Sequence, residues 1–337
     1  MTSQQEIRNL IKGKLPLKPL FMPLIFSVAA RVEDIPVSVF VSNPTKLVSA
    51  AREIQRFLGT QSVVAYFDTK LEAEACGCRV SYEGTLPKVV SHPLEEGGTI
   101  EALSQGDILS KGRIPVAIEV IKRLRLLVKD QAIVSSVTGP FTLSSNLWGE
   151  GFIEEFNIRF RPFANLLDVA GSIALRLARA FCEAGVNMLL ITEEKIPELS
   201  AGIFEEKLYG ILKPICNVAR YYETLPVLMI RGRMDEEWLG YFFHSAPDCF
   251  VFGDVTDFDA LEDLATKAGK SFAIPVPLYI FGMDKGAVNQ ELKKLVPKGV
   301  QSYTRCALVT TQWEIPYDAD LKSLNENVKT LIDVISR

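Results

Sequence analysis

Histidine is nearly absent from this chain of 337 residues, which contains only His92 and His244. Because imidazole is a common metal ligand and the usual general base near neutral pH, this scarcity argues against most histidine-based catalysis and most metal sites. The six cysteines are scattered along the chain and include no Cys-x-x-Cys pair. We therefore predict reduced thiols and a cytoplasmic protein.

The chain also lacks an excess of positive charge and any long apolar run. It has 37 Lys and Arg against 41 Asp and Glu, whereas a nucleic-acid-binding protein normally presents a basic surface. Its apolar stretches are only a few residues long, and a membrane helix needs about 20. The first residues, MTSQQEIRNLIKGK, do not resemble a signal peptide. With 48% hydrophobic residues, the composition predicts a globular protein that binds neither nucleic acid nor membrane.

Eight short apolar runs alternate with longer amphipathic segments. Runs of this kind are typical of parallel strands that are covered on both faces. They are Leu20–Val28, Ser62–Asp68, Ala132–Pro140, Asn187–Glu193, Pro226–Gly232, Cys249–Asp254, Ser271–Leu278 and Ser302–Leu308. The predicted helices are Thr45–Leu58, Ile114–Val128, Phe152–Glu183, Phe204–Tyr222, Asp235–His244, Asp257–Ala268, Gly286–Leu295 and Asp320–Ile335. Asn43, Asp257 and Asp320 are predicted to begin three of them.

Eight strand–helix units in a chain of this length predict an α/β protein with a TIM (β/α)8 barrel, in which residues 1–19 form an N-terminal helical extension. A doubly wound open sheet is the alternative. It would carry a glycine-rich phosphate-binding turn, and the sequence contains neither G-x-G-x-x-G nor G-x-x-x-x-G-K-[ST]. Residues 85–111 are predicted to form an insertion, a lid or hairpin, after the second strand. Because no repeat or linker interrupts the pattern, we expect residues 1–337 to form one domain.

Polar residues stand at the predicted carboxyl ends of the strands, where TIM barrels place their chemistry. Any one of them is explained equally well as an ordinary polar strand end, but the ring as a whole predicts an active site. Its predicted members are Asp68, Thr138, Thr142, Glu193, Glu194, Arg231, Arg233, Asp254 and Cys306.

Two segments beside these strand ends are rich in polar groups. Phe67–Gly77, FDTKLEAEACG, is expected to place Asp68 at the mouth of the barrel, followed by Glu72 and Glu74 in an extended or turn segment. Thr138–Gly149, TGPFTLSSNLWG, offers hydroxyl and backbone N–H groups at a helix start, where an anionic substrate group binds well. The alternatives are a polar loop for the first segment and a well-capped helix for the second.

These two segments, the strand Pro226–Gly232 and the segment Tyr303–Ala307 resemble the uroporphyrinogen decarboxylase superfamily. Within it, the chain most resembles the branch of methylcobamide:coenzyme M methyltransferases, which the Pro-flanked first strand, PLFMPLIFSV, supports. The resemblance extends over residues 20–335 and implies a TIM barrel. It leaves the activity open, because the superfamily contains both decarboxylases and methyltransferases.

The resemblance to the decarboxylases is incomplete at the loop after the first strand. The decarboxylases have an arginine-rich loop there that grips a polyanionic porphyrinogen, whereas this chain has only Arg31, with Glu33 and Asp34 beside it. Asp68 matches the decarboxylase aspartate, but the position of the decarboxylase tyrosine falls near Asn146. These differences disfavour decarboxylation of uroporphyrinogen itself.

The resemblance to the methyltransferases is incomplete at their zinc site. Those enzymes hold zinc by a His-x-Cys pair at the fifth strand and a cysteine at the eighth, and the zinc converts the acceptor thiol into a thiolate. Here Met229 and Arg231 occupy the positions of the pair, and only Cys306 remains. We therefore predict no bound metal. A carboxylate-rich site formed by Glu193, Asp254 and Cys306 is the alternative.

The resemblance implies a corrinoid-linked one-carbon methyltransferase without the usual zinc site. We expect no tightly bound cofactor, methylcobamide or another corrinoid as co-substrate, a corrinoid-binding protein as partner, and a homodimer. Glu193 or Glu194 would donate a proton to the leaving group. Arg231 would orient a substrate carboxylate, and Asp68 would position the substrate. The remaining predicted substrate-binding residues are Glu74, Thr138, Thr142, Asn146, Arg233 and Cys306.

Two alternatives remain open at this stage. One is a carboxy-lyase that acts on a tetrapyrrole or a smaller carboxylate, with Asp68 as the proton source and Arg231 beside the departing carboxylate. The other is a non-catalytic barrel that binds a corrinoid or serves as a partner subunit. Neighbouring genes would help to discriminate, because a corrinoid-binding protein favours methyl transfer and haem-pathway genes favour decarboxylation.

Overall fold

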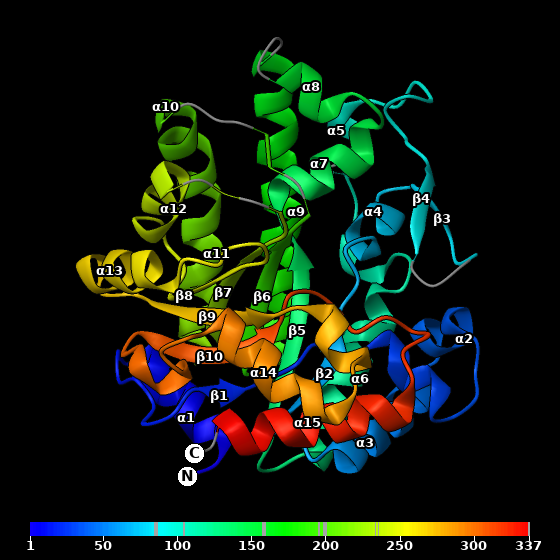
Figure 1. Cartoon of the computed structure of the whole chain (residues 1–337). Helices are drawn as coiled ribbons and strands as arrows, with labels where there is room; N and C mark the ends of the chain where they lie inside the picture. Colours follow the sequence, from blue (N-terminus) through cyan, green and yellow to red (C-terminus); the bar gives the residue numbers. More distant parts are fainter. Residues whose placement is uncertain are drawn as a thin grey trace.

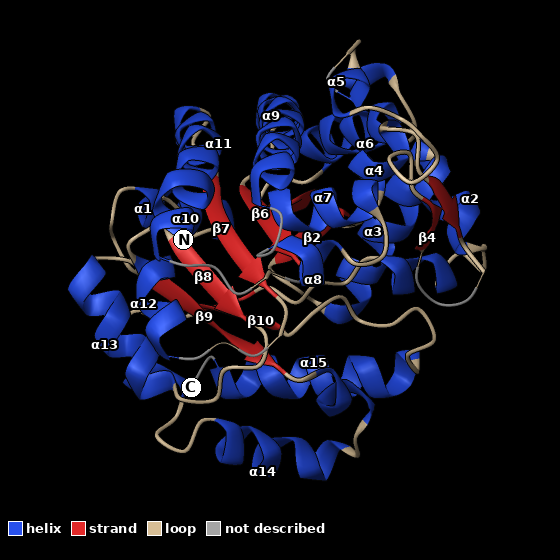
Figure 2. Cartoon of the chain, turned by 90° about the horizontal axis from the view of Figure 1, so that it is seen from above, coloured by secondary structure: helices blue, strands red, loops and turns tan. Residues whose placement is uncertain are grey.

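Eight parallel strands form one curled sheet that is surrounded by helices (Figures 1 and 2). The computed structural model describes residues 1–83, 87–103, 105–156, 160–194, 196–197, 201–232, 234 and 236–335. The strands of the sheet are β1 (Leu20–Phe21), β2 (Ser62–Tyr66), β5 (Ala132–Thr138), β6 (Met188–Glu193), β7 (Leu225–Ile230), β8 (Cys249–Phe252), β9 (Ser271–Val276) and β10 (Cys306–Thr311).

The order of the strands is β1-β10-β9-β8-β7-β6-β5-β2, and every neighbouring pair is parallel. Among the described residues no ladder joins β1 to β2, so the hydrogen-bonded sheet stays open between these two strands. Every residue of the eight strands is buried, as expected where the inner face packs on itself and the outer face packs on helices. The predicted α/β fold of the TIM-barrel type is confirmed.

The helices cover the outside of the sheet (Figure 2). The α-helices are α1 (Ser3–Ile11), α2 (Val37–Ser42), α3 (Pro44–Leu58), α4 (Leu71–Ala75), α5 (Ile100–Leu103), α6 (Ile114–Leu127), α7 (Pro140–Trp148), α8 (Phe152–Phe156), α9 (Phe160–Ala184), α10 (Ala201–Ile203), α11 (Gly210–Tyr221), α12 (Glu236–Phe243), α13 (Phe258–Ala268), α14 (Lys285–Leu295) and α15 (Leu321–Ile335). A π-helix, η3 (Phe204–Tyr209), leads into α11, and short 3₁₀ turns lie at η1 (Ser27–Arg31), η2 (Ile108–Ser110), η4 (Leu278–Gly282) and η5 (Val300–Ser302). Within the described ranges, none of the helices combines the length and apolarity needed to cross a bilayer.

Three predicted helix starts are confirmed by their side-chain caps. Asn43 accepts hydrogen bonds from the backbone N–H groups of Thr45 and Lys46 at the start of α3. Asp257 accepts from Ala260 N at the start of α13, and Asp320 accepts from Ser323 N at the start of α15. Each carboxylate or amide oxygen satisfies a donor that the first helical turn leaves free.

The first and last strands differ from the prediction. β1 contains only Leu20 and Phe21, and a 3₁₀ turn begins at Ser27. At the other end, Ser302 lies in a 3₁₀ turn and β10 runs from Cys306 to Thr311. The polar residues at the end of this strand continue it, because Thr310 Oγ1 donates to Met22 O (2.8 Å) and Thr311 Oγ1 accepts from Leu24 N (3.0 Å).

An antiparallel hairpin follows β2 and lies beside the mouth of the barrel (Figure 1). Its strands are β3 (Arg79–Ser81) and β4 (Lys88–Ser91), so it begins before the start of the predicted insertion at residue 85. Residues 84–86 lie outside the described residues. At the opposite end of the barrel, α1 is anchored by Ser3 Oγ, which donates to Gln61 O at 2.6 Å.

Candidate active site

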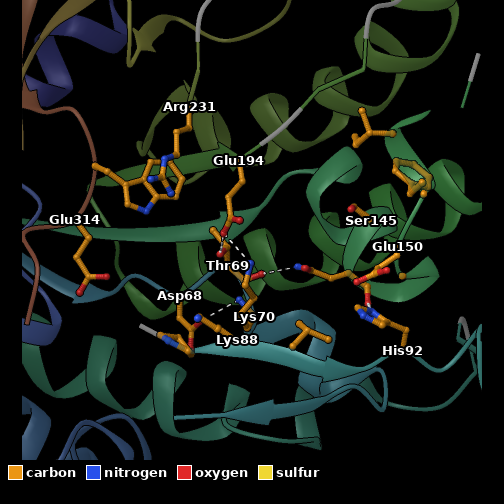
Figure 3. Close-up of a pocket in the computed structure, with 18 of the residues that line it drawn as sticks. Asp68, Thr69, Lys70, Lys88, His92, Ser145, Glu150, Glu194, Arg231 and Glu314 are labelled. Atoms are coloured by element: carbon orange, nitrogen blue, oxygen red, sulfur yellow. Dashed lines mark hydrogen bonds and ion pairs between the residues drawn. The ribbon is translucent and has the colours of Figure 1, made fainter. Parts of the chain in front are cut away.

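A cavity of about 750 Å³ opens at the carboxyl ends of the strands, a volume that suits a small organic molecule (Figure 3). Its wall combines the segments after β2, β6, β7 and β10 with the β4 hairpin strand, the end of α7 and the start of α8. The charged residues and histidine that line it are Asp68, Lys70, Lys88, His92, Glu150, Glu154, Glu194, Arg231 and Glu314.

Asp68 lies in the cavity wall and is held from behind by Arg113. Arg113 Nη1 lies 2.6 Å from Asp68 Oδ2, and Lys70 N donates to Asp68 Oδ1 at 2.8 Å. The same guanidinium lies 2.6 Å from Glu74 Oε2 and donates to the Tyr66 hydroxyl at 2.9 Å. Glu74, predicted to bind substrate, thus binds Arg113 and is not among the residues that line the cavity.

Glu194 also lines the cavity, and Lys70 neutralises it. Lys70 Nζ lies 2.7 Å from Glu194 Oε1, and Thr69 Oγ1 donates to the same oxygen. Burial by itself would raise the pKa of the Glu194 carboxyl, but the charge of Lys70, the hydrogen bonds from Lys70 and Thr69 and the charge of Arg231 lower it overall. Glu194 is therefore suited to hold a negative charge and poorly suited to the predicted role of proton donor.

Glu193 does not point into the cavity, which corrects the prediction. Consecutive residues of a strand face opposite sides, so Glu193 lies buried beneath α7 while Glu194 faces the cavity. The Glu193 carboxylate accepts hydrogen bonds from Phe141 N (3.1 Å), Thr142 N (2.8 Å) and Thr142 Oγ1 (2.6 Å). Burial raises the pKa of Glu193 to about 7, although these hydrogen bonds lower it. Glu193 therefore caps the first turn of α7, and Thr142 serves this cap and does not line the cavity.

Thr138 is likewise occupied inside the fold. Its backbone N–H donates to Glu72 Oε1 at 2.7 Å, and its hydroxyl donates to Glu72 Oε2. Both residues are fully buried, and neither lines the cavity. Burial raises the pKa of Glu72 to about 7, although the hydrogen bonds from Thr138 lower it. Thr138, predicted to bind substrate, is therefore placed away from the cavity.

Arg231 projects into the cavity from the end of β7 (Figure 3). Its guanidinium carbon is 5.4 Å from the centre of the Trp313 ring, within the range of a cation–π contact. Phe67 packs edge-on against the same ring with centroids 5.3 Å apart. No described carboxylate lies within ion-pair distance of Arg231, so its charge is available to a ligand. Arg233 lies outside the described residues.

Asp254 and Cys306 are not where the sequence suggested. Asp254 is exposed after β8, accepts a hydrogen bond from Gln312 Nε2 and does not line the cavity. Cys306 begins β10 and is buried at the amino end of the barrel, where its thiol bonds to Leu308 O at 3.3 Å. Burial raises the pKa of this thiol, with the nearby Cys249 adding to the effect. Cys306 is a core thiol.

The described side chains do not fit the zinc ion that the resemblance to methyltransferases implies. Glu193, Asp254 and Cys306, the alternative ligand set, lie beneath α7, on the surface and at the opposite end of the barrel. In the described part of the chain, no three His, Cys, Asp or Glu side chains form a cluster with metal-ligand geometry. At the end of β7, the guanidinium of Arg231 would also oppose a dication.

Asn146, predicted to bind substrate, lines the cavity and contacts two neighbouring elements. Its side-chain amide nitrogen donates to Thr69 O at 3.1 Å, and its backbone carbonyl oxygen lies 2.8 Å from His92 Nδ1. A carbonyl can only accept, so His92 Nδ1 carries the proton. Asn146 therefore joins the segment after β2 to the hairpin.

Several residues of the site went unrecognised in the sequence. Among them are Lys70, His92, Arg113, Trp313 and Glu314. Trp313 and Glu314 follow β10 directly, and placing the end of that strand at Thr311 would have revealed both. Glu314 is 6% exposed and accepts a hydrogen bond from Ser27 N at 2.5 Å. Arg113 carried no such signal, because it lies far from any strand end in the sequence.

The close approach of the Glu193 side chain to Gly139 can be tested by substitution. A Cβ atom at Gly139 would lie 2.2 Å from Glu193 Cδ. Gly139→Ala should therefore displace the buried carboxyl from α7 and lower the free energy of unfolding by about 2–3 kcal/mol, measured by urea denaturation. Gly240→Ala in α12 is the control, because its Cβ would meet nothing within 4 Å, and it should not destabilise the chain. Equal effects of the two variants would contradict the role of Gly139.

Comparison with known proteins agrees with this architecture. The chain is similar to methylcobamide:CoM methyltransferase MtbA of Methanosarcina acetivorans (28% identity over 194 residues, 56% of each chain) and to MtaA of Methanosarcina barkeri (27% over 159 residues, 45% of this chain and 46% of the relative). It spans about half the length of the curated relatives it matches. Its structure is similar to a methyltransferase from Methanosarcina mazei (TM-score 0.81, 21% identity, covering 100% of this chain and 98% of the other). It is less similar to a B12-independent methionine synthase from Shewanella sp. W3-18-1 (TM-score 0.56, 13% identity, 96% and 95% covered).

These two structural similarities, both below 25% identity, show the fold alone. The sequence comparison goes further, since the uroporphyrinogen decarboxylase (URO-D) family matches residues 2–304, nearly the whole chain. The protein belongs to the uroporphyrinogen decarboxylase family.

Proposed function

We propose that the chain is a corrinoid-linked methyltransferase that removes a methyl group from a small substrate carrying a carboxylate. Membership of the URO-D family and the similarity to methylcobamide:CoM methyltransferases support methyl transfer. A reduced corrinoid, free or on a partner protein, is the proposed methyl acceptor and acts as a co-substrate.

The observation that carries this proposal is the free cation of Arg231 in the cavity. Asp68 and Glu194 already have cationic partners in Arg113 and Lys70, at 2.6 and 2.7 Å. Arg231 has no such partner among the described carboxylates and lies against the Trp313 ring. A guanidinium beside an aromatic surface suits a carboxylate on a small, flat molecule, because it can donate two parallel hydrogen bonds.

The charge of the cavity disfavours uroporphyrinogen as the substrate. Five carboxyl groups line the wall, against the three cations Lys70, Lys88 and Arg231. A substrate with many carboxylates would be repelled by this wall, whereas a substrate with one carboxylate needs only Arg231. Decarboxylation of a smaller acid remains the second candidate, because the same arginine would also hold a departing carboxylate.

Methyl transfer to reduced cobalamin tests the proposal. The methyl donors would be 4-methoxybenzoate, glycine betaine and 3-(methylthio)propionate, which present O-, N- and S-methyl groups on a carboxylate. We expect one of them to produce methylcobalamin, followed by its absorption spectrum. Release of CO2 from the same acids without methylcobalamin would support the decarboxylase. The absence of both methylcobalamin and CO2 would indicate a non-catalytic barrel.

Arg231→Lys tests the proposed role of the arginine. Lysine keeps the charge but loses the planar pair of donors, so the Kd for 4-methoxybenzoate should rise by about 10- to 100-fold, or roughly 1.5–3 kcal/mol. Isothermal titration calorimetry measures the affinity, and thermal unfolding reports on the fold. Arg52→Lys in α3, outside the cavity, is the control and should bind like the wild type. Unchanged affinity with a lower Tm for Arg231→Lys would leave Arg231 with a structural role only.

A further inference from the structure

Glu314 combines deep burial with direct access to the cavity. It follows β10, is 6% exposed and lines the same part of the wall as Asp68 (Figure 3). The donor in contact with it is Ser27 N, at 2.5 Å from Oε1. No cationic side chain lies within ion-pair distance of Glu314 among the described residues, whereas Arg113 lies 2.6 Å from Asp68.

This environment favours the neutral acid. Burial raises the pKa of Glu314 to about 7, the charge of Asp68 raises it further, and the hydrogen bonding with Ser27 opposes both. Two neighbouring carboxyl groups, one with a cation and one without, are a common arrangement for a charged group and a proton donor in one site. The other titratable side chains that line the cavity are Lys70, Lys88, His92, Glu150, Glu154, Glu194 and Arg231.

Two other carboxyl groups resemble Glu314 in burial but not in position. Burial raises the pKa of Glu72 and Glu193 to about 7 as well. Glu72 bonds to Thr138, and Glu193 bonds to the start of α7, and neither lines the cavity. They cannot meet a ligand, but they are matched controls for Glu314.

We propose that Glu314 is the catalytic acid that donates a proton to the heteroatom losing its methyl group. This rests on the proposed methyl transfer. The bond between the methyl carbon and the heteroatom breaks, and its electron pair stays on the heteroatom, which takes the proton of the Glu314 carboxyl. An electron pair of the reduced corrinoid forms the new bond to the methyl carbon. The Glu314 carboxylate then regains a proton from water.

The first test is the pH dependence of turnover with 4-methoxybenzoate and reduced cobalamin. An acid with a pKa near 7 must be protonated, so kcat/KM of the wild type should fall about tenfold per pH unit above pH 7. Glu314→Gln should lower kcat by about 10²- to 10⁴-fold and abolish this fall. Glu314→Asp keeps a carboxyl and should keep the fall. Glu72→Gln should turn over like the wild type, with the same pH profile.

The second test measures binding and does not require turnover. A protonated Glu314 donates a hydrogen bond to the ether oxygen of 4-methoxybenzoate, so binding by the wild type should weaken about fivefold to tenfold from pH 6 to pH 8. Glu314→Gln, whose amide donates at every pH, should show no such change. 4-Methylbenzoate lacks the ether oxygen. The wild type and Glu314→Gln should therefore bind it with the same affinity at pH 6 and pH 8.

The two tests separate the failure of Glu314 from the failure of the proposed function. Turnover by Glu314→Gln within threefold of the wild type, with the fall above pH 7 intact, would overturn the role of Glu314 and leave methyl transfer standing. Failure of turnover with all three methyl donors, with the pH effect on 4-methoxybenzoate binding present and lost in Glu314→Gln, would overturn methyl transfer and support the contact of Glu314 with the heteroatom. Absence of both effects would overturn both proposals.

Discussion

Arg113→Met should lower the free energy of unfolding by about 3–5 kcal/mol, because it removes one partner of a buried network of charges. The Arg113 and Asp68 side chains are 7% and 2% exposed, and Glu74 shares the same guanidinium. Methionine fills much of the volume but leaves two carboxylates and the Tyr66 hydroxyl without their donor. Urea denaturation at pH 7 measures the effect.

The control for Arg113 is an exposed pair on α6. Arg123 Nε lies 2.7 Å from Glu119 Oε1, and both side chains are 40% exposed or more. Arg123→Met should change the free energy of unfolding by less than about 0.5 kcal/mol. The double variant Asp68→Asn with Arg113→Met should recover part of the loss, since it removes one of the unpaired charges. A loss below 1 kcal/mol for Arg113→Met would show that the network does not stabilise the cavity wall.

The stability of the chain should fall as the pH rises from about 4.5 to 7. Burial raises the pKa of Glu72, Glu193 and Glu314 to about 7, whereas unfolded glutamate titrates near 4.5. The folded chain therefore binds more protons in this range, so their stabilising contribution is complete below pH 4.5 and is lost as the pH passes 7. Each group contributes up to about 3 kcal/mol. Glu194 and Asp320, whose pKa values are lowered, act in the opposite direction.

A substitution at Glu72 isolates one of these contributions. In Glu72→Gln, the amide oxygen can still accept from Thr138 N, and the amide nitrogen can donate to the Thr138 hydroxyl. The variant should match the wild type near pH 5 and exceed it in free energy of unfolding by about 2–3 kcal/mol at pH 8. Glu53→Gln on the exposed face of α3 should show no such divergence. Parallel pH profiles for wild type and Glu72→Gln would contradict the assignment.

The presence or absence of a cation beside each carboxyl group of the cavity links the stability of the chain to the proposed chemistry. Asp68 and Glu194 have cations beside them, whereas Glu314 has none among the described residues. Burial raises the free energy needed to ionise Glu314, and the same effect would make it a proton donor near neutral pH. A cavity of this kind gains a reactive group at the expense of stability above pH 7.

Local patterns in the sequence were sufficient for most of the architecture. Apolar runs of strand length, amphipathic segments between them and the caps at Asn43, Asp257 and Asp320 predicted the parallel α/β barrel. They also predicted that Asp68, Glu194 and Arg231 lie at its mouth. These features depend on the periodicity of burial and on hydrogen bonds between residues close in the chain, and both can be read from a sequence.

Which side chains face the cavity was decided by tertiary structure. Glu193 and Glu194 are adjacent in the sequence, and only the pairing of β6 with its neighbours decides which of them lies beneath α7. Cys306 was expected at the mouth of the barrel but lies at its opposite end, and Glu314 lies at the mouth, because Thr310 and Thr311 bond to the β1 segment and extend β10. Where a strand ends depends on the segment of the chain that pairs with it, since the last polar residues of the strand bond to that neighbouring segment. The sequence by itself therefore determined the barrel and its functional end, and the packing of distant segments determined which carboxyl groups reach a ligand.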